Sequence, residues 1–324
     1  MREAKPTVPG RSSEIDALRS FALAGILFVN IWYFADPYAL GGAISPNHSS
    51  AADLLTRFTV AALFEAKFYL LFSFLFGYSF VLQERAAIAI GQSPVPRARR
   101  RLLGLLLLGL LHGVFLFFGD ILLTYALMGL ILLATRSLRT SSAVITGSAL
   151  IGVIGSVVLA VGLGIAATVT GLGITTQLQM IGLAAAVVQA CLTVYVDRDR
   201  FSVLAVGIST LTAPLLTAGY VSLLLLLFRT KPGARVCSFL APAGRIALTN
   251  YLTQSLVLGL IFTGLGLQLA DRLPAVAVAG IAVVIFAAQL VASRILLDHM
   301  RTGPAEWVLR RLTYGRQRQA AAGC

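Results

Sequence analysis

Two polar side chains, His112 and Asp120, stand out in a chain that is otherwise strongly apolar. His112 lies ten residues beyond Leu102, where a charge-free stretch begins, so a helix would place it about 15 Å along that stretch. Asp120 follows eight residues later, and eight residues turn a helix about 80° past two full turns, which predicts side chains on adjoining faces. A neutral histidine accepts protons from hydroxyls and amines, so the pair fits a general base for acyl transfer.

Both residues also have a purely structural interpretation. His112 is alternatively a ring that ties two helices together through a hydrogen bond. Asp120 is alternatively a cap on the helix that begins at Ile121, because Gly119-Asp120 is a common turn sequence. Tyr125 lies five residues after Asp120 and returns down the partner helix, which predicts a hydroxyl near the depth of His112.

Two basic residues at expected helix ends are candidates for binding an anion. Arg19 follows Asp16 at a spacing of three, so both charges lie on one face at the membrane boundary. Its planar guanidinium could hold a phosphate or could anchor the helix at the interface. Lys67, beside Glu65, is interpreted as part of a boundary pair rather than as a catalytic group.

The segment Arg245–Gln254 carries unusually many hydrogen-bonding side chains into an apolar stretch. Arg245 and Thr249 lie one helical turn apart, as do Asn250 and Gln254. Lipid offers such groups no partner, so the pattern predicts either a lined cavity or polar contacts between helices. His48 lies in a polar loop after Pro46-Asn47, and we expect it to be freely solvated.

Several common catalytic and metal-binding patterns are absent from the sequence. There is no GxSxG elbow, no phosphate-binding Walker loop and no HExxH zinc motif. Cys191, Cys237 and Cys324 are far apart, which indicates neither a disulfide framework nor a thiolate metal site. We therefore expect no metal cofactor, and any chemistry depends on the sparse polar set above.

The composition excludes an ordinary soluble domain. Of the 324 residues, 58% are hydrophobic and 12% are charged, and the mean hydropathy is +0.87. A soluble domain carries about 25% charged residues, so this chain is predicted to be a multi-pass membrane protein. The formal charge of +13 is then a property of cytoplasmic loops and does not indicate a nucleic-acid partner.

Charge-free stretches predict an all-α helical bundle with about ten membrane crossings and both termini in the cytoplasm. The basic turn 97–101, the pair Arg136 and Arg139, and the basic loop 229–245 are all expected on the cytoplasmic side. An even number of crossings is therefore required between Arg139 and Arg229. Three short spans within 140–196 and one ending near Phe228 satisfy that parity, and nine crossings in total is the alternative. Residues 1–14 form a cytoplasmic tail, 15–300 a single transmembrane domain, and 301–324 a basic cytoplasmic tail.

Taken in order, several short segments resemble the YeiB-like bacterial membrane proteins, domain-of-unknown-function family 418. The chain departs from that family in its compact middle, where members usually have a longer external insertion. The matching segments cover nearly the whole chain, and they are Ile15-Asp-Ala-Leu-Arg19, Gly25-Ile-Leu-Phe-Val-Asn30, Lys67-Phe68 with Leu75-Phe-Gly77, Gly109-Leu-Leu-His112 with Gly119-Asp-Ile-Leu-Leu-Thr-Tyr125, Gly244-Arg-Ile-Ala-Leu-Thr-Asn-Tyr251, and Gly303-Pro-Ala-Glu-Trp307 before Arg310.

The resemblance implies acyl transfer, because the family is similar to a broader transmembrane acyltransferase superfamily that includes the lysosomal heparan glucosaminide acetyltransferase. Members of that superfamily bind acyl-CoA on the cytoplasmic side and pass the acyl group to an acceptor across the bilayer. In several of them the catalytic histidine lies near the first helix or its outer loop. Asn30 stands there in this chain, which leaves His48 and His112, and the family motif favours His112.

The resemblance to bacterial membrane proteins implies a location in the bacterial inner membrane. On the hypothesis of acyl transfer, each candidate residue has a role. Arg19, Arg245 and Lys67 would bind the phosphates of acyl-CoA or acetyl-CoA as co-substrate. His112 would deprotonate the acceptor, Asp120 would orient the acceptor or the base, and Tyr125 with Asn250 would polarise the thioester carbonyl.

The expected partners are the lipid bilayer and a small-molecule, sugar or lipid acceptor, and a homodimer is an open alternative. Two rival functions remain open from the sequence. A proton-coupled transporter would use His112 and Asp120 as a proton relay without covalent chemistry. A noncatalytic membrane protein would use them for structure alone.

Overall fold

The computed structural model describes residues 12–89, 91–134, 174–196 and 203–314, and these residues form helices without a β-strand. The predicted all-α class is confirmed. In chain order the α-helices are α1 (Ser13–Ala35), α2 (Ala51–Leu63), α3 (Lys67–Ala89), α4 (Pro94–Phe115), α5 (Ile121–Ala134), α7 (Ile174–Cys191), α8 (Val203–Phe228), α9 (Lys231–Arg245), α10 (Ala247–Phe262), α11 (Ala275–His299) and α12 (Pro304–Tyr314). A short 3-10 helix spans Pro37–Gly41, and a π-helical turn follows α7 over Leu192–Val196.

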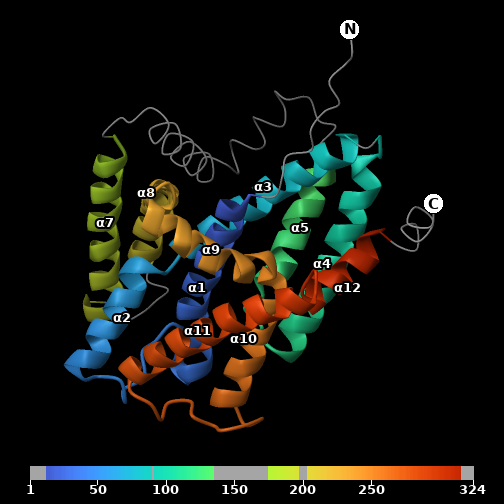
Figure 1. Cartoon of the computed structure of the whole chain (residues 1–324). Helices are drawn as coiled ribbons and strands as arrows, with labels where there is room; N and C mark the ends of the chain where they lie inside the picture. The colour runs from blue at the N-terminus through green and yellow to red at the C-terminus, as the bar shows by residue number, and fades with distance from the viewer. Residues whose placement is uncertain (1–11, 90, 135–173, 197–202, 315–324) are drawn as a thin grey trace.

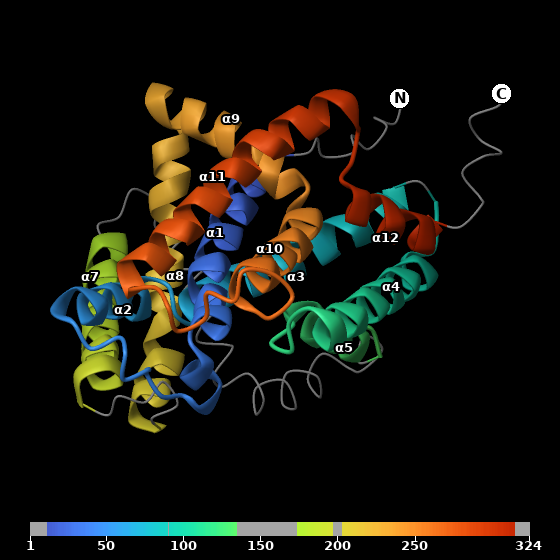
Figure 2. The ribbon, with the colours of Figure 1, turned by 90° about the horizontal axis from the view of Figure 1, so that it is seen from below.

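Helix α1 runs through the middle of the bundle (Figure 1 and Figure 2) and packs against α3, α9, α10 and α11. Ser12 caps its first turn, because the Ser12 side chain accepts a hydrogen bond from the backbone N–H of Ile15 at 3.4 Å. Apolar residues occur on every face of this helix, and Leu18, Leu23 and Ile26 are all fully buried. A helix that is apolar all round belongs in a core, which explains the central position of α1.

The basic segment 229–245, expected as a loop, is largely helical. Thr230 caps α9 by accepting a hydrogen bond from the backbone N–H of Gly233 at 3.1 Å, and a proline in the first turn suits a helix start. Between Thr212–Phe228 and Lys231–Arg245 the chain bends by 113°. The bend lays α9 against α1, and a count of charges alone does not reveal such a polar helix.

The hairpin expected from Gly119-Asp120 joins α4 to α5, which pack against each other. Helix α4 begins at Pro94, eight residues before the expected start at Leu102, because Pro94 and Pro96 fit a first helical turn and Arg97–Arg101 continue it. The end of the chain expected as a basic tail contains α12, which packs against α4 and α10. The Glu306 carboxylate accepts hydrogen bonds from the backbone N–H groups of Leu248 and Thr249 at 2.8 and 3.2 Å, and so caps α10.

Three helical stretches are long and apolar enough to cross a membrane, namely Ser13–Ala35, Ala51–Ala89 and Ala275–His299, and the bent pair α8–α9 would make a fourth. These candidates come from the described residues alone. Residues 140–173, which hold much of the stretch expected to contain three spans, lie outside them.

The outer faces of α4 and α11 carry the exposed apolar side chains that a membrane protein presents to lipid. Val114 and Phe115 are 69% and 72% exposed on α4, and Val284 is 67% exposed on α11. A water-soluble surface rarely gathers large apolar side chains in this way. The described helices therefore have the character of a membrane protein.

The close approach of α9 to α1 gives a test of the packing. A Cβ atom at Gly244 would lie 1.7 Å from the Asp16 carbonyl oxygen, which is backbone and cannot swing aside. Gly244→Ala should lower the free energy of unfolding by about 1–3 kcal/mol or more, because the added methyl group overpacks the contact. Thermal unfolding in detergent measures the loss. Gly280→Ala, whose Cβ would meet nothing within 4 Å, is the matched control and should melt like the wild type; equal melting of both variants would contradict the packing.

Candidate functional site

The α4–α5 hairpin brings His112 and Asp120 into direct contact. His112 Nδ1 lies 2.7 Å from Asp120 Oδ1, and both side chains are only 1% exposed. The hairpin can close this tightly because residue 109 is glycine: a Cβ there would lie 2.7 Å from Asp120 Oδ2 and 2.5 Å from the Leu123 nitrogen. The sequence thus places the base candidate and its partner in one compact unit.

Asp120 joins three helices at once. Its Oδ2 accepts a hydrogen bond from the backbone N–H of Leu123 at 2.6 Å, which caps α5 as the structural interpretation expected. Its Oδ1 accepts from Tyr251 on α10 at 3.4 Å as well as from His112 on α4. The capping role and the role as partner of His112 are therefore compatible, because different carboxylate oxygens serve them.

The surroundings of Asp120 assign the tautomer of His112. An ionised carboxylate only accepts hydrogen bonds, and the three groups facing it are all able to donate. The proton of the neutral imidazole is then on Nδ1, and Nε2 carries the lone pair. Nε2 is buried and has no hydrogen-bond partner among the described residues. An oriented imidazole with an unused lone pair has the form of a general base.

Tyr251 is a site residue that the sequence reasoning missed. Its ring centroid lies 4.9 Å from that of His112, and its hydroxyl accepts a hydrogen bond from the Ile121 N–H at 3.3 Å while it donates to Asp120. The only signal for it was its position beside Asn250 in the Gly244–Tyr251 segment. Tyr251 fixes the hairpin to α10.

Tyr125 and Asn250 lie in separate hydrogen-bond networks. The Tyr125 hydroxyl donates to the Tyr69 carbonyl at 3.2 Å and accepts from Ser73 at 3.0 Å, which ties α5 to α3. The Asn250 amide donates to the Ala243 carbonyl at 3.1 Å and to Ser293 Oγ at 2.8 Å, which ties α10 to α9 and α11. Both donors of the Asn250 amide are occupied, so this side chain acts as a connector between helices.

The structure does not gather Arg19, Arg245 and Lys67 into one site. Arg19 bonds Asp16 at 2.5 Å and Ser79 at 2.7 Å, whereas the exposed Arg245 bonds the Arg301 carbonyl at 2.9 Å. Lys67 is buried, with Nζ 3.0 Å from the Ala61 carbonyl oxygen and 2.9 Å from Gln189 Oε1. Lys67 connects α3 to α2 and α7.

The expectation that His48 is freely solvated is wrong, because its side chain is 3% exposed. Its Nδ1 lies 3.0 Å from Arg57 Nη2, and Arg57 also pairs with the buried Asp36. Arginine has no acceptor, so His48 Nδ1 accepts and the proton of the neutral ring is on Nε2. His48 and His112 thus have opposite tautomers, and only His112 presents an unused lone pair.

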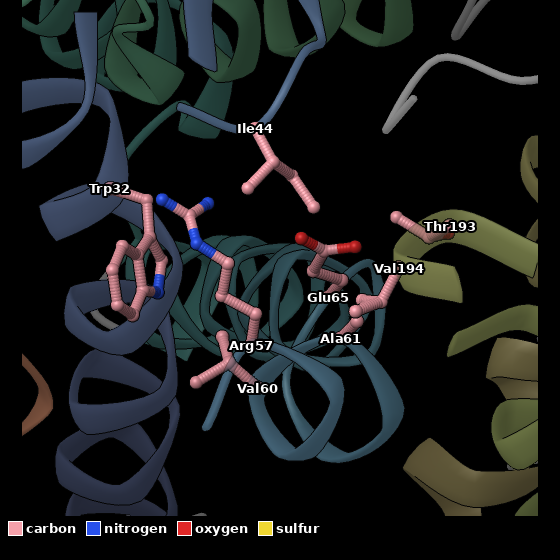
Figure 3. Close-up of a pocket in the computed structure, with 8 residues that line it drawn as sticks. All are labelled: Trp32, Ile44, Arg57, Val60, Ala61, Glu65, Thr193 and Val194. Carbon is pink, nitrogen blue, oxygen red and sulfur yellow. The ribbon is translucent and has the colours of Figure 1, made fainter. Parts of the chain in front are cut away.

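Arg57, Asp36 and His48 form a cluster, here called the Arg57 cluster. A cavity of about 20 Å³ lies beside it, between Trp32 and Glu65 (Figure 3). The Arg57 guanidinium lies over the Trp32 ring, 4.5 Å from its centroid. A cavity of that volume has room for about one water molecule and none for an acyl acceptor. Within the described ranges, no group of three or more His, Cys, Asp or Glu side chains is placed to hold a metal ion.

Comparisons with known proteins relate the chain to a family. The family described as "Protein of unknown function (DUF418)" matches residues 169–316. The chain is 28% identical to an uncharacterized 39.9 kDa protein of Bacillus acidopullulyticus, with 95% of each chain covered. It is 26% identical to the uncharacterized YxaH of Bacillus subtilis, with 97% of each chain covered. It is 28% identical to the uncharacterized YeiB of Escherichia coli, covering 94% of this chain and 96% of that protein. No solved structure matches.

The pair formed by Arg57 and Asp36 gives a test of the Arg57 cluster. Arg57→Ala leaves the fully buried Asp36 carboxylate without its cation, which should cost about 3–5 kcal/mol of unfolding free energy. Thermal unfolding in detergent checks this, with the exposed Arg272→Ala as a control of equal charge change. Identical melting of the two variants would show that the pair does not stabilise the fold.

Proposed function

The chain belongs to the YeiB-like DUF418 family, and from that premise we propose that it is a membrane-embedded acyltransferase. It would move an acyl group from an acyl thioester such as acyl-CoA to a hydroxyl or amine of a small-molecule, sugar or lipid-linked acceptor. The observation that carries the proposal is the buried His112–Asp120 pair with its unused Nε2 lone pair. A histidine oriented by a carboxylate is the arrangement that activates a nucleophile in acyl transfer.

The proposed reaction follows from the assigned tautomer. As the acceptor oxygen or nitrogen attacks the thioester carbonyl, its proton moves to His112 Nε2. The imidazolium that forms is stabilised by the Asp120 carboxylate 2.7 Å away. When the tetrahedral intermediate collapses, the carbon–sulfur bond breaks and the same proton passes from Nε2 to the leaving thiolate. Histidine returns to its starting form, and no metal or redox step is required.

In our proposal, access to Nε2 depends on the aromatic rings around His112. The ring centroid of Tyr251 lies 4.9 Å from that of His112, and the ring centroid of Phe117, from the connection between α4 and α5, lies 6.5 Å away. Phe117 in turn stacks on Phe34 of α1, with centroids 5.1 Å apart. In our proposal a shift of this connection away from α1 uncovers Nε2 for the acceptor.

The proposal includes a topology of ten crossings in the bacterial inner membrane with both termini in the cytoplasm. Its support is the distribution of basic residues, which gather in segments 97–101, 229–245 and 301–318. An acyl donor would then come from the cytoplasm, and the α4–α5 connection would face the opposite side.

A variant that keeps the hydrogen bond but removes the base tests the catalytic assignment. In His112→Asn the side-chain amide can still donate to Asp120, so the fold should persist, while acyl transfer should fall by about 10²–10⁴-fold. The measurement compares acylated metabolites by mass spectrometry in a deletion strain that carries the wild type, His112→Asn or the exposed-residue control His299→Ala. Loss of the product in His112→Asn alone is the expected outcome.

Two other outcomes would overturn this assignment. A folded His112→Asn protein that forms the full amount of product would remove His112 from the chemistry. Unchanged acylation together with a loss of proton-coupled substrate flux in membrane vesicles would favour the transporter, because the same buried pair can relay protons.

The topology is tested with a reporter that is active only outside the cytoplasm. A fusion after Cys324 should be inactive and a fusion after Gly42, in the connection that follows α1, should be active. An active fusion after Cys324 would contradict a cytoplasmic C-terminus and an even number of crossings.

A further inference from the structure

A second cavity, of about 780 Å³, lies between α3, α4 and α5 and is much larger than the one beside Arg57. Its volume is within the range of about 300–1,000 Å³ that small-molecule sites have in proteins. Most of its wall is apolar, with Phe74, Phe76, Phe80 and Leu133 among its residues. A long hydrocarbon chain would fit such a wall, because the transfer of its methylene groups from water to an apolar surface is favourable.

One end of the cavity is strongly basic. Arg97 and Arg101, which lie one helical turn apart on α4, both line it. Arg101 Nη1 and Arg97 Nε are buried and have no hydrogen-bond partner among the described residues. The Arg101 guanidinium lies 5.7 Å from the Phe76 ring centroid, and Arg97 lies over the Tyr314 ring of α12 at 4.5 Å. Buried guanidinium N–H groups without acceptors are costly, so they indicate a ligand that supplies anionic oxygens.

The other charges near this end do not cancel the two arginines. Arg19 is close enough to repel Arg101, and it is already paired with Asp16 at 2.5 Å. Glu84 and Gln83 also line the cavity, on α3. Among the described residues, two arginines and one carboxylate line the cavity, and an anionic group would offset the remaining positive charge.

From this combination we infer that the α3–α4–α5 cavity binds a single-chain amphiphile, with its hydrocarbon chain along the apolar wall and its phosphate or carboxylate head on Arg97 and Arg101. The cavity wall also includes Ser73, which donates a hydrogen bond to the Tyr125 hydroxyl at 3.0 Å. The bound chain would therefore lie beside the α4–α5 hairpin that carries the candidate site. Binding of this kind does not depend on turnover at His112.

Binding is measured by native mass spectrometry of the full chain in phosphatidylcholine nanodiscs. The two anionic probes are 1-palmitoyl-glycerol-3-phosphate, which represents a membrane source, and palmitoyl-CoA, which represents a cytoplasmic source. Monopalmitoylglycerol is the neutral probe with the same chain. At least one anionic probe should bind at least 10-fold more tightly than the neutral probe, and the one that binds identifies the source. Equal affinities for all three, or no binding of either anionic probe, would overturn the inference.

Three variants test separately how the anionic head group and the hydrocarbon chain of the ligand are bound. Arg101→Gln should weaken anionic binding at least 10-fold, whereas Arg100→Gln, an exposed neighbour with the same charge change, should leave it unaltered. Gly77→Leu should weaken binding of every probe, because a Cβ at Gly77 meets nothing within 4 Å and the added side chain enters the cavity space. Equal effects of Arg101→Gln and Arg100→Gln would overturn the inference. His112→Asn should bind like the wild type, so failure of acyl transfer and failure of this site are distinguishable.

Discussion

The arrangement of α4, α5 and α10 depends on the hydrogen bonds that the Asp120 carboxylate accepts. It accepts from the His112 imidazole, the Leu123 N–H and the Tyr251 hydroxyl, and it is almost completely buried. A buried charge is tolerated only where donors surround it, so these three groups hold their helices at fixed positions. The same requirement fixes the Nδ1–H tautomer of His112, and the stability of the hairpin and the chemistry of the imidazole therefore have one cause.

An apolar environment imposes the same rule on the rest of the described chain. Asn250, Lys67 and Arg57 each bond groups on neighbouring segments of the chain, because lipid offers them no alternative. Against that background, the polar atoms left without partners are informative. His112 Nε2 is one, and the guanidinium nitrogens at the basic end of the α3–α4–α5 cavity are others. The Nε2 lone pair lacks a hydrogen-bond donor, which the hydroxyl or amine of an acyl acceptor would supply. The guanidinium N–H groups lack a hydrogen-bond acceptor, which an anionic ligand would supply.

The sequence predicted the all-helical class, and it singled out His112 and Asp120 as a pair on adjoining helix faces. It did not predict their direct contact, because α4 ends at Phe115 and the chain then turns back and brings Asp120 against His112. It did not predict Tyr251, since 130 residues separate Tyr251 from Ile121, whose N–H it binds. His48 was misjudged for a related reason: a polar loop predicts exposure, but Arg57 and Asp36 bury it through contacts that spacing does not encode. The α9 helix was mistaken for a loop because the spacing of charged residues identifies only charge-free apolar spans. It does not identify polar helices that pack on a core helix.

The central claim is that Asp120 holds His112 in the neutral tautomer with its proton on Nδ1 and none on Nε2. The side-chain ¹⁵N resonances of the histidines in lipid bilayers test this claim most directly. Solid-state NMR distinguishes a protonated from an unprotonated ring nitrogen, and His112→Asn and His48→Gln assign the two signals. The account predicts a protonated Nδ1 and an unprotonated Nε2 for His112, and the reverse for His48. A proton on Nε2 of His112 with a bare Nδ1 would contradict it.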